Sequence, residues 1–222
     1  MTPSLKKIEK RTQYDLVKRT KRENFRLLNQ RYARCGQTVL LGDSITEIFN
    51  WYELFESFIR ETGQAVYNRG ISGDTSDRLL ERLEINALNI APRNLVLLIG
   101  TNDLGVGAPI SFTVGNVEKI LRRSRESLPK LNIVLQAVYP VNKHLSRDAR
   151  YMVGRRENAV IARINAELRP LAAQFNAHWL NLTGPLSDAQ GNLSGEYCYD
   201  GLHLNARGFE IAAQGIIPLL DR

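Results

Sequence analysis

The feature of this chain that most constrains its fold is a regular alternation of short apolar segments with longer helical ones. Residues 94–99 read Asn-Leu-Val-Leu-Leu-Ile, so other elements must cover both faces of this expected strand. Alternating strands and helices predict a parallel sheet between two helical layers. We therefore expect an α/β fold, a three-layer α/β/α sandwich with a five-stranded parallel sheet. The expected strands are residues 38–41, 65–67, 94–99, 132–138 and 178–182, and the expected helices after the first 36 residues are 45–60, 75–90, 114–127, 155–176 and 208–220.

Polar, glycine-rich turns follow the first three expected strands. They are Gly-Asp-Ser at residues 42–44, Gly-Ile-Ser-Gly-Asp at residues 70–74 and Gly-Thr-Asn-Asp at residues 100–103. In open parallel sheets with right-handed crossovers, ligands bind at the carboxyl ends of the strands. The functional site is therefore expected where these three turns meet.

Ser44, in the first of these turns, is the candidate nucleophile. A serine hydroxyl needs a base to take its proton, and a histidine base needs a carboxylate that fixes its tautomer. His203 precedes the last expected helix, and Asp200 stands three residues earlier on the same loop. The other two histidines, His144 and His178, lie after the fourth strand and at the start of the fifth. An isolated Asp-x-x-His favours a capped turn, but together with Gly-Asp-Ser it favours a catalytic pair.

Four segments resemble the sequence blocks of one hydrolase family. They are residues 42–45 (Gly-Asp-Ser-Ile), 68–75 (Asn-Arg-Gly-Ile-Ser-Gly-Asp-Thr), 100–103 (Gly-Thr-Asn-Asp) and 200–203 (Asp-Gly-Leu-His). In this order they resemble the blocks of the GDSL, or SGNH, hydrolases, whose sheet is flavodoxin-like. The chain looks most similar to the bacterial esterases of this family that resemble platelet-activating-factor acetylhydrolase and lysophospholipase L1.

The resemblance implies a role for five positions. Ser44 matches the nucleophile, His203 the base and Asp200 the residue that orients the base. The Ser44 N–H, the Gly73 N–H and the Asn102 amide match the three donors of the oxyanion hole. Such donors stabilise the charge that develops on the carbonyl oxygen in acyl transfer.

For the other glycine and aspartate residues of these turns, we expect structural roles. Gly70 competes with Gly73 for the second donor position, but Gly73 fits the family position better, and Gly70 is expected to serve the turn. Asp43, Asp74 and Asp103 are expected to bond loop N–H groups beside the site rather than to take part in the chemistry.

The resemblance implies a serine esterase that hydrolyses carboxylic esters with small to medium acyl groups through a Ser-His-Asp acyl-enzyme mechanism. A lysophospholipase or thioesterase acting on longer chains and a carbohydrate O-deacetylase are the alternatives within the enzyme class. Residues 104–114 and 142–156 are the expected pocket walls. From another class, a binding module that uses the basic N-terminal helix stays open.

Neither a cofactor nor a metal is expected. No P-loop is present, the glycines at 70 and 73 lack the G-x-G-x-x-G spacing, and no H-E-x-x-H motif occurs. Ser44 is not in a G-x-S-x-G elbow, which disfavours the α/β-hydrolase fold.

The net charge of +7 is concentrated in the N-terminal segment. Residues 1–34 hold 11 Lys/Arg and three acids. We interpret residues 1–36 as a basic N-terminal helical extension and residues 37–222 as the hydrolase domain. The extension is expected to pack on the body or on a partner subunit with its basic face solvated. No nucleic acid is expected as a partner beside the small-molecule ester, and family resemblance suggests a homodimer.

The sequence carries no sign of a membrane segment or secretory signal. No run approaches the roughly 20 apolar residues of a spanning helix, and no apolar region follows the first charges. Cys35 and Cys198 are expected to be reduced thiols, although a single pairing stays open. A cytoplasmic location without stable membrane insertion is the resulting expectation.

Overall fold

The computed structural model describes residues 3–222, and within the first helix it describes the side chains of residue 13 and of residues 15 onward. Its centre is a parallel sheet with the strand order β2-β1-β3-β4-β5, the flavodoxin order. The expectation of a five-stranded parallel sheet is confirmed. The strands are β1 (Thr38–Gly42), β2 (Val66–Gly70), β3 (Asn94–Leu98), β4 (Asn132–Gln136) and β5 (His178–Leu180).

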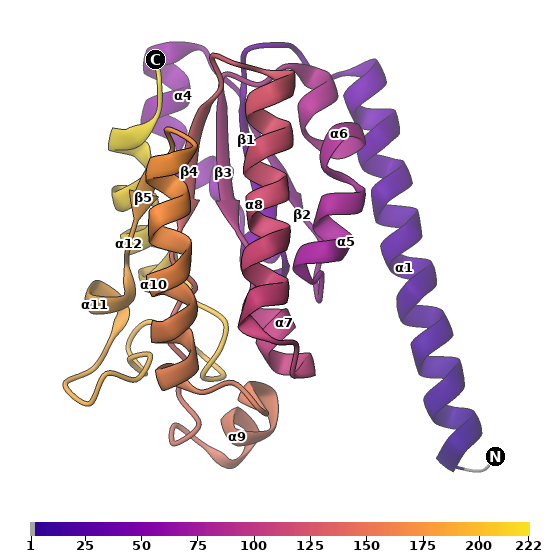
Figure 1. The fold of residues 1–222 in the computed structure, drawn as a ribbon, viewed down its shortest axis with the longest axis vertical. Coiled ribbons are helices and arrows are strands. Elements are labelled where there is room, and N and C mark those ends of the chain that lie inside the picture. Colours follow the sequence, from indigo (N-terminus) through magenta and orange to yellow (C-terminus); the bar gives the residue numbers. More distant parts are fainter. Residues whose placement is uncertain (1–2) are drawn as a thin grey trace.

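Helices cover both faces of this sheet (Figure 1). They are α1 (Pro3–Arg31), α2 (Ser44–Glu47), α3 (Trp51–Leu54), α4 (Glu56–Thr62), α5 (Ser76–Glu81), α6 (Leu83–Asn86), α7 (Thr101–Val106), α8 (Ile110–Ser127), α9 (Arg147–Val153), α10 (Asn158–Gln174), α11 (Thr183–Leu186) and α12 (Ala206–Ile216), with 3₁₀ turns at Leu88–Ile90 and Ile217–Leu219.

Strand β3 shows why the apolar run is continuous. Leu95 and Leu97 pack in one core cluster, together with buried side chains of α5, α6, α8 and α10. Val96 and Leu98 pack in the second cluster, with buried side chains of α3, α4, α11 and α12. Successive residues of a strand point to opposite faces. The four leucine and valine residues of this strand therefore pack against helical layers on both faces, and the three-layer sandwich is confirmed.

The expected helix over residues 45–60 is wrong, because the structure breaks it into α2, α3 and α4. The last carbonyls of α2 find partners outside the helix. The Trp51 indole donates to Thr46 O at 2.8 Å, and the Asn68 amide donates to Thr46 O and to Glu47 O. A helix can end early where other groups satisfy its last carbonyls. Tertiary bonds thus override the local helical pattern here.

The expected helix over residues 75–90 is also divided, into α5, α6 and a 3₁₀ turn. The division falls at Arg82, which is 2% exposed. Its guanidinium donates to Asp74 Oδ2 at 2.7 Å, to Arg69 O at 2.8 Å and to Gly42 O at 2.9 Å. Arg82 therefore ties the ends of β1 and β2 together, and its own backbone leaves the helical conformation (φ −109°, ψ 4°).

The other bounds shift in smaller ways. Strand β2 runs on to Gly70, and α8 begins at Ile110, where the expected helix began at residue 114. The expected helix over residues 155–176 is observed as α10, with α9 before it. Helices α7, α9 and α11 had no counterpart among the expected elements.

Helix α1 is a single long helix that runs beside α5 and α6 (Figure 1). The Asn29 amide donates to Ile85 O and Asn86 O, and the Asn86 amide donates to Arg22 O. The helix packs on the body, one of the two expected placements, but its basic face is not solvated throughout, because Lys18 is 4% exposed. The division into an extension and a hydrolase domain stays a prediction.

Two smaller features bear on the sequence expectations. Cys35 is exposed and Cys198 is buried, and both thiols are free. Within residues 3–222, none of the helices combines the length and the hydropathy needed to cross a bilayer.

Candidate active site

Three strand ends and one late loop bring the candidate residues together. Strand β1 ends at Gly42, and Asp43 caps α2, so that Ser44 is the first residue of that helix. Asn102 lies in the first turn of α7, directly after β3. His203 comes from the loop before α12. Helix α7 marks the carboxyl edge of the sheet, at the lower end of Figure 1.

Ser44, His203 and Asp200 form a continuous hydrogen-bonded chain. Ser44 Oγ lies 2.9 Å from His203 Nε2, and His203 Nδ1 lies 2.7 Å from Asp200 Oδ2. The two side chains of the acid–base pair are 13% and 14% exposed. Asp200 accepts at Nδ1–H, so the lone pair of Nε2 faces the serine hydroxyl. This geometry lets the histidine take the proton of Ser44.

Backbone bonds keep Asp200 ionised and fixed. Its Oδ1 accepts from Leu202 N at 3.0 Å and from His203 N at 2.7 Å. Partial burial acts to raise the pKa of Asp200, but the bonds from His203 and Leu202 outweigh it, and the pKa lies below its ordinary value. The carboxylate is therefore charged at neutral pH and stabilises an imidazolium at His203.

The ring of Tyr199 stacks on the imidazole of His203, with 5.9 Å between the ring centroids and 15° between the planes. Tyr199 is 60% exposed, so the stacked pair lies at the mouth of the site. Neither His144 nor His178 takes part, because both are exposed and lie away from this chain of bonds.

Two backbone N–H groups are open to an oxyanion. Within the described part of the chain, the N–H groups of Ser44 and Gly73 donate to no protein acceptor. Gly73 has φ +70°, a conformation that favours glycine. The N–H of Gly70, in contrast, is bonded to Asn68 Oδ1 at 2.9 Å. The structure thus separates the two glycines: Gly70 belongs to the turn, and Gly73 presents a free donor.

A third donor, the Asn102 amide, has its orientation set by Arg156. Arg156 Nη2 lies 2.9 Å from Asn102 Oδ1. A guanidinium can only donate, so this atom of Asn102 must be the oxygen, and Nδ2 must face the other way. There it lies 3.3 Å from Asp43 Oδ2 and 3.1 Å from Asp74 O. These bonds hold the amide beside the nucleophile.

Arg156 is itself a buried, fully engaged side chain. It is 8% exposed, and its Nε donates to Thr101 O at 2.8 Å while Nη1 donates to Val153 O at 3.0 Å. Desolvation lowers the pKa of Arg156, and the carboxylates of Asp43 and Asp200 oppose this. A fixed cation therefore stands behind the Asn102 donor. From its sequence pattern, residue 156 was expected only as part of a pocket wall.

Arg156→Met is expected to lower kcat/KM for p-nitrophenyl acetate about tenfold, because an unheld Asn102 amide no longer points Nδ2 at the oxyanion. The neighbouring Arg155 is exposed and supplies the matched control, Arg155→Met, which should change kcat/KM by less than about twofold. Steady-state kinetics on both variants measure the difference. Equal losses in the two variants would show that charge alone, rather than the bond to Asn102, is responsible.

The three aspartates of the turns are all buried, and each holds part of the site. Asp43 Oδ1 accepts from Ile45 N at 3.0 Å, and Asp103 accepts from the N–H and the hydroxyl of Ser76. Asp74 differs from the expectation, because it pairs with side chains, at Arg82 and Lys18, rather than with loop N–H groups. Burial raises the pKa of Asp43 to about 7, while the bond from Ile45 N opposes this.

A hollow of about 470 Å³ begins beside Gly73. Its apolar wall consists of Val106, Ala108 and Phe112, which belong to the segment 104–114 expected to line a pocket. The charged residues that line the same hollow are Lys18, Arg78 and three aspartates, Asp15, Asp77 and Asp103. The second expected wall, residues 142–156, contributes instead to a smaller hollow of about 170 Å³.

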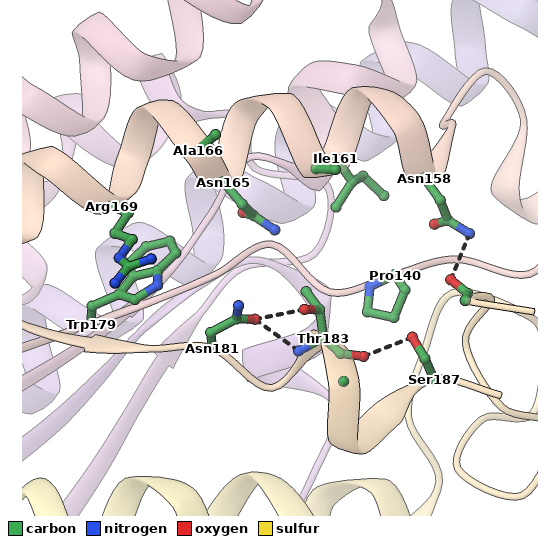
Figure 2. A pocket seen from close by; sticks show the side chains of 13 residues that line it. Pro140, Asn158, Ile161, Asn165, Ala166, Arg169, Trp179, Asn181, Thr183 and Ser187 are labelled. Atoms are coloured by element: carbon green, nitrogen blue, oxygen red, sulfur yellow. Dashed lines mark hydrogen bonds between the residues drawn. The ribbon is translucent and has the colours of Figure 1, made fainter. Parts of the chain in front are cut away.

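Another hollow, of about 530 Å³, lies between α10 and the β5–α11 segment (Figure 2). Its polar groups bond to one another: Asn181 accepts from Thr183, and Ser187 donates to Thr183 O. It is lined by none of the candidate catalytic residues. Among the described residues, no cluster of three His, Cys, Asp or Glu side chains could hold a metal ion.

Comparisons with known proteins agree with this geometry. Residues 40–211 match the model of the GDSL-like Lipase/Acylhydrolase family. The alpha1 subunit of platelet-activating factor acetylhydrolase IB from Bos taurus is 28% identical over 192 residues, which cover 84% of this chain and 75% of that protein. A solved structure from Streptococcus pneumonia, described as a platelet activating factor, is 27% identical with a TM-score of 0.90 and covers 99% of this chain and 100% of its own. A GDSL-like lipase from Bacteroides thetaiotaomicron shares the fold, with a TM-score of 0.74 at 24% identity and coverage of 88% and 94%.

Proposed function

Because this chain belongs to the GDSL-like lipase/acylhydrolase family and is a hydrolase acting on ester bonds, we propose that it is a serine esterase for small to medium acyl groups, with Ser44, His203 and Asp200 as its catalytic triad. The observation that carries the proposal is the bonded chain from Ser44 Oγ through the imidazole to Asp200. Its three members come from two distant parts of the sequence and meet in hydrogen-bonding geometry.

In the proposed mechanism, Ser44 Oγ attacks the ester carbonyl while His203 Nε2 takes the hydroxyl proton. The tetrahedral oxyanion accepts from the Ser44 N–H, the Gly73 N–H and Asn102 Nδ2, which exchanges its longer bond, to Asp43 Oδ2 at 3.3 Å, for this contact. His203 then gives its proton to the leaving alcohol oxygen, and the acyl group stays on Ser44. Water attacks this acyl-enzyme as His203 takes a proton from it, and the acid leaves as Ser44 regains its proton.

The acid–base pair also explains why one histidine serves both halves of the reaction. Asp200 stays charged while His203 gains and loses a proton, because the hydrogen bonds from the His203 side chain and from the backbone N–H groups of His203 and Leu202 outweigh the effect of burial and lower the pKa of this carboxyl. A fixed negative charge 2.7 Å from Nδ1 favours the imidazolium in each tetrahedral state.

The length of the acyl group is the open part of the proposal. Relatives named acetylhydrolases support a short acyl group. The alternative, a lysophospholipase or thioesterase for longer chains, is favoured by one observation, the apolar wall beside Gly73. Val106 and Phe112 on that wall are 68% and 44% exposed, which is unusual for apolar side chains beside a reacting centre.

A series of p-nitrophenyl esters from acetyl to dodecanoyl tests the proposal. We expect kcat/KM to be highest for acetyl to butyryl and to fall at least about tenfold by dodecanoyl. Phe112→Ala is the matched variant, and it should leave the acetyl ester unaffected. If dodecanoyl were the better substrate and Phe112→Ala lowered only that rate, the longer-chain alternative would replace the proposal.

A further inference from the structure

Helix α1 touches the loop that carries the second proposed oxyanion donor, and it does so through lysines. We propose that Lys18 and Lys21 of α1 are positioning residues for the Gly73 N–H, so that the basic N-terminal helix is part of the catalytic scaffold. The proposal rests on the proposed function, because Gly73 matters to catalysis only if its N–H binds the oxyanion.

Lys18 holds the loop from one side. Its Nζ donates to Gly73 O at 2.6 Å and lies 3.4 Å from Asp74 Oδ1. The side chain is only 5% exposed, and Asp74 is fully buried. No described group donates a hydrogen bond to Asp74 Oδ1, so the lysine charge is what faces it. Burying an ammonium group is costly unless it is paired, so this contact holds the loop closely.

Lys21 acts from the other side through Glu47. Lys21 Nζ pairs with Glu47 Oε1, and Glu47 Oε2 accepts from the N–H of Ser72. Glu47 is the last residue of α2, the short helix that begins with Ser44. The contact therefore links α1, the nucleophile's helix and the donor loop in one set of bonds.

These bonds fix the donor because they lie on both sides of it. The Gly73 N–H belongs to the peptide unit between Ser72 and Gly73. The N–H of Ser72 precedes this unit, and the carbonyl of Gly73 follows it; both are bonded. A peptide unit is planar, so fixing the groups before and after it leaves its N–H little freedom. Gly73, at φ +70°, has no side chain that could hold it otherwise.

Helix α1 contacts the body largely through polar side chains. The face that contacts the body includes Lys18, Arg22, Phe25 and Asn29, which follow the helical spacing. Arg22 Nη2 donates to Arg78 O at 3.1 Å, and Asn29 accepts from Arg69. Three of these four side chains are polar, and each of the three makes at least one hydrogen bond to the body. Part of the positive charge of α1 is thus directed inward, towards the site.

Lys18→Met and Lys21→Met test the proposal, with Arg19→Met as the matched control. Methionine keeps the length of the side chain and removes the donor, and Arg19 is exposed. For p-nitrophenyl acetate, Lys18→Met should lower kcat about tenfold with little change in KM, and Lys21→Met about threefold. Affinity for a trifluoromethyl ketone, whose adduct carries an oxyanion, should fall by the same factor as kcat/KM. Arg19→Met should match the wild type in all three.

Amide hydrogen exchange over residues 71–75 gives a readout that does not depend on activity. The N–H groups of Ser72 and Asp74 are bonded, and both should exchange faster in the two lysine variants than in the control. Lys21 is 35% exposed, so that variant stays informative if Lys18→Met does not fold. Wild-type kcat and wild-type exchange in both folded lysine variants would overturn the proposal. If the wild-type chain hydrolysed no ester, the proposed function would fail, while the exchange data would still show whether the lysines hold the loop.

Discussion

Ser44→Ala is expected to lower kcat for p-nitrophenyl acetate by at least about 10⁴-fold while the chain stays folded. Alanine removes the only oxygen that lies 2.9 Å from His203 Nε2, so no covalent acyl-enzyme forms. The remaining donors at Gly73 and Asn102 still bind the carbonyl oxygen, which leaves a small residual rate by direct attack of water. Initial rates together with a thermal unfolding curve measure both parts of the expectation.

Ser111→Ala is the control for this variant, because Ser111 is exposed on α8 and outside the site. It should keep full activity. A second measurement is labelling by an organophosphate, which should modify the wild type at Ser44 and leave Ser44→Ala unlabelled. Substantial turnover by a folded Ser44→Ala protein would rule out this serine as the nucleophile.

Asp200→Asn is expected to lower kcat about 10³- to 10⁴-fold at neutral pH. The amide oxygen can keep the two backbone bonds that Asp200 Oδ1 accepts from Leu202 N and His203 N. The amide nitrogen then faces His203 Nδ1 and donates to it. The imidazole must hold its proton on Nε2 instead, where it cannot accept the proton of Ser44.

The chain offers a close control in Asp188, whose Oδ1 accepts from Gln190 N and from Asn192 N at 2.9 Å each. Asp188→Asn makes the same chemical change in a similar turn that holds no histidine, and it should leave kcat unchanged.

The pH dependence of stability should also differ between Asp200→Asn and the wild type. The pKa of Asp200 is lowered in the folded state, so its stabilising contribution is present above the unfolded-state pKa and is lost as the pH falls through the folded-state pKa. Urea unfolding between neutral and acid pH should show that the free energy of unfolding falls less in Asp200→Asn than in the wild type. If the free energy of unfolding fell equally with pH in both proteins, the lowered pKa of Asp200 would be contradicted.

The sequence was informative about this site because its chemistry is local and follows the strands. Ser44 and Asn102 each come directly after a strand, and Asp200 and His203 share one loop. A parallel sheet brings such turns to one edge. Family resemblance then supplied a role for each residue, and in the structure Ser44, His203 and Asp200 lie within hydrogen-bonding distance in that order.

What the sequence could not predict depends on side chains that reach across elements. Arg156 bonds to Asn102 from 54 residues away, and Lys18 bonds to Gly73 from 55 residues away. Neither contact leaves a local pattern. Arg82, in contrast, has a weak local signal in the sequence. It stands three residues after Leu79, which places it on the buried side of the expected helix. A charged residue at a buried helical position indicates a specific partner.

Helix α1 shows the same limit for hydrophobic periodicity. The apolar side chains of Val17 and Leu28 are 45% and 43% exposed, so they do not form the contact with the body. The seam that contacts the body instead includes Lys18 and Asn29, which are nearly buried. Hydrophobic periodicity is read from apolar residues alone. It therefore does not identify the buried face of a helix that contacts the body through hydrogen bonds and ion pairs. The predictions of continuous helices over residues 45–60 and 75–90 are wrong for a related reason. Trp51, Asn68 and Arg82 interrupt these helices through tertiary hydrogen bonds, which leave no periodic pattern.

The separation of 159 residues between Ser44 and His203 has a consequence for biosynthesis. Strands β1, β2 and β3 are adjacent in the sheet and are complete by Leu98, so the nucleophile's half of the molecule can begin to fold while the rest of the chain is still being made. The proposed general base is translated more than a hundred residues later, on the loop that precedes α12. If the proposed triad is correct, a nascent chain carries an inert Ser44 until residue 203 has been made. Recovery of ester hydrolysis during refolding should then report the contact between Ser44 and His203 rather than the formation of the sheet.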